Sequence, residues 1–360
     1  MNPLAVRIAR LIEVQGPISV AQFMSMALHD PVDGYYATRE VIGAGGDFIT
    51  APEISQMFSE LLGAWIVQAW RDQGSPSPAR LVELGPGRGT LMADALRAAR
   101  LDPQFQKSVE VVLIETSAGL RAAQAEVLKD APVPVRWLER FADSLADRPV
   151  FVLANEFFDA LPIRQFVFGE RGWCERMVGV DRGGALTFAL SPTPSPLAVP
   201  SERGIPEAGA VYETCPSGEA LIEQIAHMIA RKGGAALIVD YGYEGQSGFG
   251  ETLQAVAHHG YANVLENPGE ADLSAHVDFA ALARAAQSAG AKAYGPMPQG
   301  EFLLSLGIVR RAEALSRNHL GESGIAKQLK RLVEPDQMGT LFKALAILPQ
   351  NAPRPPGFIP

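Results

Sequence analysis

The sequence lacks long apolar runs and long runs of basic residues, and each absence excludes a class of protein. No apolar run approaches about 20 residues, the length that a helix needs to cross a bilayer, so we expect no membrane span. Lys and Arg number 31 against 40 Asp and Glu, which gives a formal net charge of -9. Because binding to nucleic acid relies on clustered Lys and Arg, nucleic acid is disfavoured as a partner.

Cysteine is also scarce. The two cysteines, Cys174 and Cys215, form neither a C-x-x-C pair nor a zinc pattern, so we expect reduced thiols and no metal site. Residues 1–14 carry Arg7 and Arg10 in an amphipathic helical pattern, without the apolar core and cleavage site of a signal peptide. These features favour a cytoplasmic protein of bacterial type.

What is present is ample apolar material for a core. Apolar residues make up 47% of the 360 residues and charged residues only 20%, so global disorder is excluded. A chain of this length can hold one large α/β domain with additions, or two domains. No internal repeat is visible.

The most informative stretch is Arg80–Leu91, which reads as a buried strand, a glycine-rich turn and the start of a helix over 91–100. Glu83 closes the apolar run, and the turn contains Gly85, Pro86, Gly87 and Gly89. Glycines allow the backbone to approach a ligand closely, because a Cβ would occupy the ligand's space.

The spacing of these glycines separates two classes of ligand. A dinucleotide fingerprint would have its third glycine where Thr90 stands, so an NAD-dependent oxidoreductase is disfavoured. The E-x-G-x-G-x-G turn instead resembles motif I of class I S-adenosylmethionine-dependent methyltransferases. In that family the acid acts through water or the backbone on the methionine ammonium end. A glycine turn that binds nothing stays open.

Two further strands end in polar residues at the same edge of the predicted sheet. Val109–Glu115 is a second buried strand, and its terminal Glu115 is placed to accept both ribose hydroxyls. Thirty residues separate Gly85 from Glu115, more than the usual twenty or so, and we place the extra length in a loop over 101–108. The alternative role for Glu115 is support of the N-terminus of a helix over 117–129.

The strand Pro149–Ala154 is followed by Asn155, Glu156 and Asp159, three polar residues among Phe157, Phe158 and Leu161. Ligands of open α/β sheets lie beyond the carboxyl ends of the strands. We expect Asn155 to contact the cofactor and prefer a substrate-facing role for Glu156 and Asp159. The alternative is that the three side chains satisfy one another.

Upstream, residues 43–55 combine glycines with Asp47, Phe48 and Thr50, a composition typical of a lid, although an ordinary connecting loop stays open. We predict a cofactor contact for Thr50. His276, Asp240 and Asp47 are further candidates for proton transfer, with a structural role as the alternative for His276. Phe48, Phe157 and Tyr241 are candidates to wall the adenine or a cation, with a core role as the alternative.

The pattern divides the chain into five segments. Residues 1–55 hold two short helices and the glycine-rich loop, and residues 56–162 the cofactor-binding half of the core. An inserted β element follows over 163–216, with strand-like alternation in Gln165–Val180, a hairpin turn at 181–184 and an exposed loop at Ser191–Pro206. Residues 217–348 complete the core with a helical insertion over 299–333, and residues 349–360 form a loose Pro-rich tail.

Longer strings connect the chain to one family. The sequence resembles the MidA family, class I methyltransferases related to the mitochondrial complex I assembly factor that methylates arginine. The resemblance rests on GYY at 34–36, GDFITAPEIS at 46–55, ELGPGRGTL at 83–91, ANEFFDALP at 154–162, DYG at 240–242, HVDF at 276–279 and MGTLFK at 338–343. It therefore spans nearly the whole chain.

The resemblance implies a Rossmann-like α/β fold with a seven-stranded sheet, closed by an antiparallel last strand, and S-adenosylmethionine as cofactor. It further implies methylation of an arginine in the 49-kDa-type subunit of NADH dehydrogenase. Roles for Glu156, Asp159 and His276 in catalysis are chemical inference and not inheritance. Alternatives are a cofactor-binding assembly factor without catalysis and a methyltransferase for a small molecule, and a homodimer stays open.

Overall fold

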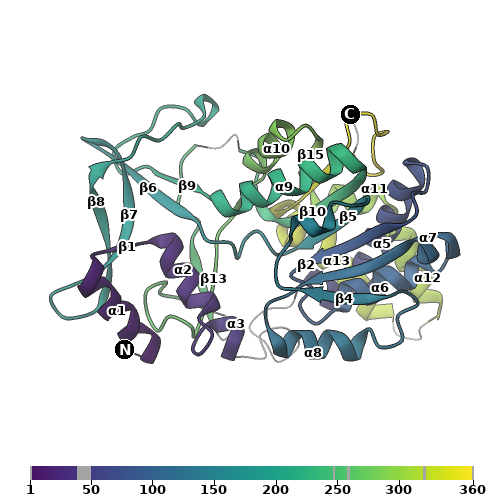
Figure 1. Ribbon diagram of the computed structural model, residues 1–360, viewed down its shortest axis with the longest axis horizontal. Coiled ribbons are helices and arrows are strands. Elements are labelled where there is room, and N and C mark those ends of the chain that lie inside the picture. The colour runs from purple at the N-terminus through teal and green to yellow at the C-terminus, as the bar shows by residue number, and fades with distance from the viewer. Residues whose placement is uncertain (1, 39–49, 246–247, 258–259, 319–321, 359–360) are drawn as a thin grey trace. The chain divides into compact units, whose positions relative to one another are not determined.

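The computed structural model describes residues 2–38, 50–245, 248–257, 260–318 and 322–358 (Figure 1). The chain forms two compact units, each assembled from separated segments. The first comprises Met1–Phe48, Asp159–Gly218 and Tyr243–Asp278, and the second Ile49–Phe158, Glu219–Gly242 and Phe279–Pro360. In the described ranges no helix has both the length and the apolar character needed to cross a bilayer.

The second unit is built on a large sheet with the strand order β15-β16-β10-β5-β2-β3-β4. The strands are β2 (Ala79–Leu84), β3 (Val109–Ile114), β4 (Val135–Leu138), β5 (Val150–Asn155), β10 (Gly234–Tyr243), β15 (Lys292–Pro298) and β16 (Phe342–Leu348). β2 runs parallel to β3 and β5, and β5 runs parallel to β10. β16 lies antiparallel between β10 and β15. The expected Rossmann-like sheet with an antiparallel last strand is confirmed.

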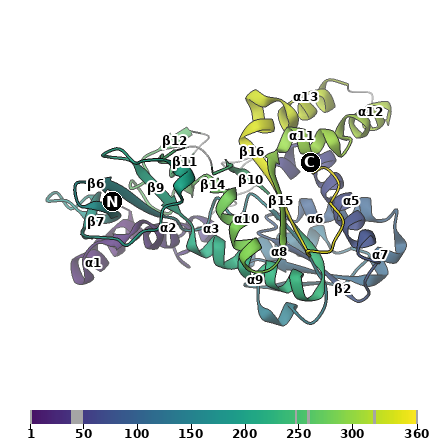
Figure 2. The ribbon, with the colours of Figure 1, turned by 90° about the horizontal axis from the view of Figure 1, so that it is seen from above.

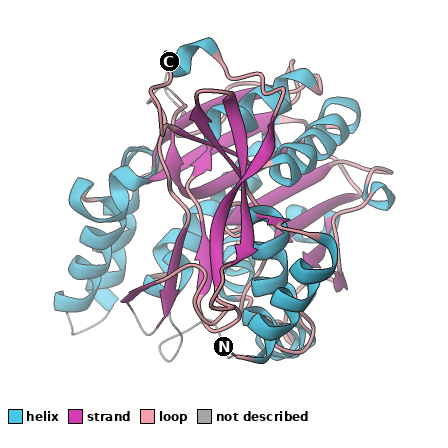
Figure 3. Ribbon diagram, turned by 90° about the vertical axis from the view of Figure 1, so that its left-hand side faces the viewer, coloured by secondary structure: helices cyan, strands magenta, loops and turns pink. Residues whose placement is uncertain are grey.

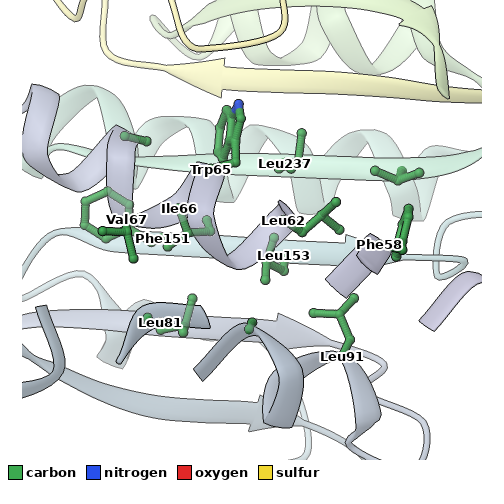
Figure 4. Close-up of a cluster of buried hydrophobic side chains, with 14 of the residues drawn as sticks. Phe58, Leu62, Trp65, Ile66, Val67, Leu81, Leu91, Phe151, Leu153 and Leu237 are labelled. Atoms are coloured by element: carbon green, nitrogen blue, oxygen red, sulfur yellow. The ribbon is translucent and has the colours of Figure 1, made fainter. Parts of the chain in front are cut away.

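Helices cover both faces of this sheet, which is why its central strands are largely apolar. One face carries α5 (Gln56–Asp72), whose Phe58, Leu62 and Trp65 pack on the strands at Leu153 and Leu237 (Figure 4). The helices α9 (Pro216–Lys232) and α10 (Phe279–Ser288) lie on the other side (Figure 2). The remaining helices of the core are α4 (Ala51–Ile54), α6 (Thr90–Ala99), α7 (Pro103–Ser108) and α8 (Ala118–Val127), with the short turn η1 (Asp143–Leu145).

The helical insertion before the last strand consists of α11 (Gln299–Ser305), α12 (Ile308–Asn318) and α13 (Glu322–Val333), followed by a π-helical turn, η3 (Pro335–Gly339). Arg311 of α12 makes a two-point ion pair with the buried Glu60 of α5, which ties the insertion to the core. The prediction of a loose tail is wrong. Phe358 is buried against Phe302, and the Pro356 carbonyl accepts a hydrogen bond from the Trp65 indole at 3.0 Å.

The first unit contains α1 (Pro3–Gln15), α2 (Val20–His29), α3 (Tyr35–Thr38) and two small sheets (Figure 3). Ser19 caps α2 in a reciprocal arrangement with Gln22, as its position before the helix predicts. The larger sheet contains β1 (Ile18–Ser19), β6 (Arg164–Gly169), β7 (Gly172–Val180), β8 (Leu186–Pro194) and β9 (Val211–Thr214). The smaller sheet contains β11 (Gln254–Ala257), β12 (Gly260–Ala262) and β13 (Asp272–Ser274), and the short strand β14 (Val277–Asp278) follows it in the chain.

Three local predictions need correction. Gln165–Val180 is two antiparallel strands, β6 and β7, and the predicted 181–184 turn then leads from β7 to β8. Residues 101–108 are not a loop, because Asp102 caps the amides of Gln104 and Phe105 and so starts α7. Ser191–Pro206 is not wholly exposed, since it contains the end of β8, the turn η2 (Ser201–Arg203) and a buried arginine.

That arginine, Arg203, holds three parts of the first unit together. Its guanidinium lies 5.4 Å from the ring centre of Tyr212 and 4.8 Å from that of Tyr243, and it pairs with the carboxylate of Asp278. A buried cation between two aromatic faces and a carboxylate is well compensated.

Candidate functional site

The glycine turn between β2 and α6 has a backbone that only glycine adopts readily. Gly85, Gly87 and Gly89 have φ values of +59°, +52° and +86°, all in the left-handed region. A Cβ on Gly85 would lie 2.7 Å from the ring of Phe157, so the turn also packs directly on the segment that follows β5. The Gly89 amide donates to the Pro86 carbonyl at 2.8 Å, which closes the turn ahead of α6.

Glu83, at the end of β2, is a buried acid with capacity for a ligand. Its side chain is 3% exposed, and within the described part of the chain its Oε2 has no hydrogen-bond partner. Burial raises the pKa of Glu83 to about 8, so the carboxyl is mostly protonated at neutral pH. A buried acceptor without a partner is costly, and a donor on a bound molecule would satisfy it. The ammonium of S-adenosylmethionine is such a donor.

Glu115 follows β3 and is held from two directions. Its Oε1 accepts a hydrogen bond from the Ser117 amide at 2.8 Å, and its Oε2 accepts one from Nε2 of Gln124 at 3.3 Å. Burial raises the pKa of Glu115, and these hydrogen bonds oppose the rise. The side chain therefore does support the start of α8, the alternative role given above, while Ser117 itself caps that helix.

Glu156 and Asn155 fix the turn after β5 through their side chains. Glu156 has a φ of +50°, unusual for a residue other than glycine, and its amide donates to the Val239 carbonyl at 3.0 Å. Its Oε1 accepts hydrogen bonds from the Ala51 amide and from Nδ2 of Asn155, both at 3.1 Å. Among the described residues, Oδ1 of Asn155 is buried without a hydrogen-bond partner.

Asp240, at the end of β10, holds the same turn from the neighbouring strand. Its side chain is 0% exposed, and its Oδ2 accepts from the amides of Phe157 and Phe158 at 3.1 and 2.9 Å. Its Oδ1 accepts from the Tyr241 amide at 2.9 Å. The carboxylate of this proton-transfer candidate is thus directed at main-chain donors.

The other candidates lie in different places. Asp159 and His276 belong to the first unit, where the Asp159 carbonyl accepts from the Ala275 amide at 2.9 Å. Burial lowers the pKa of His276, and Glu213 opposes that shift. Thr50 precedes α4 without a side-chain cap, and the ring of Tyr241 packs edge-on against Phe342. Asp47, Phe48 and the predicted lid over 43–49 lie outside the described residues.

Sequence reasoning missed Gln124, the side chain that joins Glu115 to the glycine turn. Its Nε2 donates to the Gly87 carbonyl at 2.6 Å as well as to Glu115. No sequence signal distinguishes it from other polar residues of a helix.

Comparison with known proteins shows the family of the chain. Residues 61–297 match the model of a family described as S-adenosyl-L-methionine-dependent methyltransferases, Methyltransf_28. The chain is 38% identical to protein arginine methyltransferase NDUFAF7, mitochondrial, from Rattus norvegicus, covering 98% of this chain and 85% of the relative. The relative of the same name from Homo sapiens is also 38% identical, over 98% of this chain and 84% of its own length.

A solved structure supports the fold and the cofactor together. A Burkholderia thailandensis protein crystallised with S-adenosylhomocysteine is 30% identical, with a TM-score of 0.81, and the match covers 99% of this chain and 92% of that one. S-adenosylmethionine is therefore the cofactor, and the left-handed glycine turn and the buried acceptors of Glu83 and Asn155 fit it.

One expectation from the sequence is overturned by these relatives. The prediction of a cytoplasmic protein is wrong, because the similar curated proteins are named as mitochondrial. The absence of a recognisable signal-peptide pattern was too weak a basis for it. The family match, the extent of identity and the cofactor-bound neighbour together establish that the chain belongs to the MidA-like family of S-adenosylmethionine-dependent methyltransferases.

Proposed function

We propose that this methyltransferase acts on an arginine side chain of a protein, and that the protein is the 49-kDa-type subunit of NADH dehydrogenase, whose assembly the modification assists. The observation that carries the arginine is an identity of 36–38% with relatives named protein arginine methyltransferase NDUFAF7. The choice of this subunit as the substrate rests on the resemblance of the GDFITAPEIS and ANEFFDALP strings to the MidA family.

In this proposal, different residues contact different parts of the cofactor. The turn of Gly85, Pro86, Gly87 and Gly89 lets the backbone approach, and Glu115 accepts hydrogen bonds from the ribose hydroxyls. Glu83 and Asn155 take donors at the methionine end, which would satisfy their buried oxygens. Thr50 contributes a hydroxyl at the start of α4. When bound, the cofactor supplies a methyl group on a positively charged sulfur.

The chemistry required of the protein is positioning and removal of a proton. A guanidinium has a pKa above about 12 and spreads its charge over three nitrogens, so carboxylates must localise the charge and accept the proton. Glu156 and Asp159 are the candidates, and they lie three positions apart in the sequence. The neutral ring that a lowered pKa implies makes His276 a further acceptor.

Glu156 is the strongest of these candidates because its backbone is strained. A left-handed φ at a residue other than glycine costs roughly 1–3 kcal/mol and persists where the surrounding structure enforces it, often at functional sites. The hydrogen bonds from Ala51 and Asn155 fix the orientation of its carboxylate. A fixed carboxylate can hold a guanidinium without first being ordered.

The test is transfer of a labelled methyl group from S-adenosylmethionine to the purified 49-kDa-type subunit, followed by acid hydrolysis and identification of the labelled amino acid. We expect methylated arginine. Glu156→Gln should slow the transfer at least about a hundredfold while S-adenosylhomocysteine still binds with similar affinity. Glu170→Gln, in the exposed turn between β6 and β7, is the matched control and should retain full activity.

Label on another amino acid would contradict the arginine assignment, and label on other subunits alone would contradict the choice of substrate. Full activity of Glu156→Gln would assign proton acceptance to another residue. Binding of S-adenosylmethionine without transfer to any complex I subunit would instead favour the non-catalytic assembly factor.

A further inference from the structure

Gln124 is a fully buried amide whose hydrogen bonds converge on the cofactor-binding segments. Its residue is 0% exposed on α8, the helix between β3 and β4. Its Oε1 accepts from the indole of Trp137 at 2.8 Å. Its Nε2 donates to the Gly87 carbonyl at 2.6 Å and to Oε2 of Glu115 at 3.3 Å.

The orientation of this amide is fixed by chemistry. An indole nitrogen can only donate, so the atom of Gln124 that faces Trp137 must be the oxygen. The two donors of the amide must then face the other way, where both neighbours, a carbonyl and a carboxylate, are acceptors. In a flipped amide, the NH2 group of Gln124 would face the indole N–H of Trp137, so that two donors would meet. Its oxygen would then face the Gly87 carbonyl and the Glu115 carboxylate, which are both acceptors.

Packing adds a second link to the glycine turn. A Cβ on Gly89 would lie 3.4 Å from Cγ and 3.5 Å from Cα of Gln124, so the glutamine lies directly beside this part of the turn. One side chain therefore binds the turn at Gly87, lies beside Gly89 and donates to the acid that follows β3. These segments are separated by about one βα unit in the sequence, and all of them belong to the second unit.

We infer that Gln124 is a positioning residue that sets the carboxylate of Glu115 for the ribose hydroxyls and holds the Gly87 peptide beside it. The inference rests on the proposed ribose role of Glu115. A carboxylate accepts about four hydrogen bonds, so a group held by Ser117 and Gln124 can still accept from a ribose hydroxyl. Trp137 acts on Glu115 only indirectly, because its indole N–H orients the side-chain amide of Gln124.

A glutamine with a merely structural role would lower the melting temperature without changing how the protein reads the ribose. The test therefore compares two ligands, S-adenosylhomocysteine and its 2′,3′-dideoxy analogue, by calorimetric titration. Wild type should bind the analogue about a hundredfold more weakly, the effect of losing two hydrogen bonds to a charged group. Glu115→Ala should bind the two ligands with similar affinity, so that the ratio of the two affinities falls to about one.

Gln124→Met keeps the length of the side chain and removes its polar atoms, and it should reduce the ratio about tenfold. Trp137→Phe, which leaves Gln124 in place, should reduce it about threefold. In the Glu115→Ala background, Gln124→Met should change the ratio no further, because its effect passes through that carboxylate.

Gln299→Met is the matched control. Gln299 is also 0% exposed, and its Nε2 donates to the Leu332 carbonyl at 2.9 Å, in the helical insertion. It should lower the melting temperature and leave the ligand ratio unchanged.

Two results overturn the inference, and they are distinguishable. If Glu115→Ala loses discrimination while folded Gln124→Met and Trp137→Phe both keep it, the ribose role of Glu115 stands and the positioning role of Gln124 is wrong. If Glu115→Ala still discriminates, the proposed ribose role fails and the inference fails with it.

Discussion

Replacing Glu83 by glutamine should change how the stability of the cofactor-free protein depends on pH. The carboxyl is 3% exposed, and burial raises its pKa from an ordinary value of 4.5 to about 8. Between these two values the folded protein retains a proton that the unfolded chain has released. The folded state is therefore the one that binds more protons, and stability falls as the pH rises through this window.

The size of the effect follows from the shift. The free energy of unfolding falls by about 1.4 kcal/mol for each pH unit between 4.5 and 8, which gives roughly 3 kcal/mol at pH 7. Glutamine is neutral throughout and nearly the same size. The advantage of Glu83→Gln over wild type should thus grow by about 1.4 kcal/mol per pH unit, whatever constant cost the new amide adds.

The assay is a pair of thermal melts, wild type and Glu83→Gln, at pH 5.5, 6.5 and 7.5 without cofactor. The difference in melting temperature should increase by about 2 °C per pH unit. Taking the difference removes the contribution of every other titrating group. A difference that stays constant with pH would refute the reasoning, because it would mean that Glu83 is already ionised in the cofactor-free protein.

The same carboxyl should link cofactor affinity to pH. Binding that brings an ammonium to Glu83 favours the ionised acid, so wild type should release a proton on binding below pH 8. Affinity for S-adenosylhomocysteine should then rise up to about tenfold per pH unit between pH 5 and 7. Glu83→Gln should bind more weakly at pH 7 and show no such rise.

Three further substitutions probe other parts of the molecule. Gly87→Val should abolish cofactor binding, because a branched residue at a φ of +52° costs roughly 1–2 kcal/mol and fills the ligand's volume; unchanged affinity in a folded variant would contradict this. Asp240→Asn should cost about 2 kcal/mol by melting, because both carboxylate oxygens accept from main-chain amides and an asparagine NH2 must then face a donor. It should also lower the rate of methyl transfer more than S-adenosylhomocysteine affinity, since the turn that carries Glu156 is disturbed; a wild-type rate would refute the link. Arg203→Met should cost about 3 kcal/mol by removing the buried cation that pairs with the Asp278 carboxylate, and an unchanged melting temperature would exclude that.

Much of the sheet and of the cofactor loop could be predicted from the sequence because their signals are local. A strand that is buried on both faces has a largely apolar sequence, and a left-handed turn favours glycine. β2 and the Gly85–Gly89 turn can therefore be predicted from local sequence patterns. Glu83 and Glu115 could be named as candidate site residues because each stands at the end of an apolar run. The same reasoning fails at residues 101–108, where a cap from Asp102 starts a helix that composition does not reveal.

The sequence by itself determined most of the strands and helices, the glycine turn after β2, and which acids stand at the strand ends. Only the tertiary structure decided what those acids touch. Gln124 reaches Gly87 across 37 positions, Glu156 reaches Ala51 across 105, and the tail residue Pro356 accepts from Trp65 across 291. Such contacts form between segments brought together by burial of apolar side chains, a force without direction along the chain. For that reason no pattern of neighbouring residues records them.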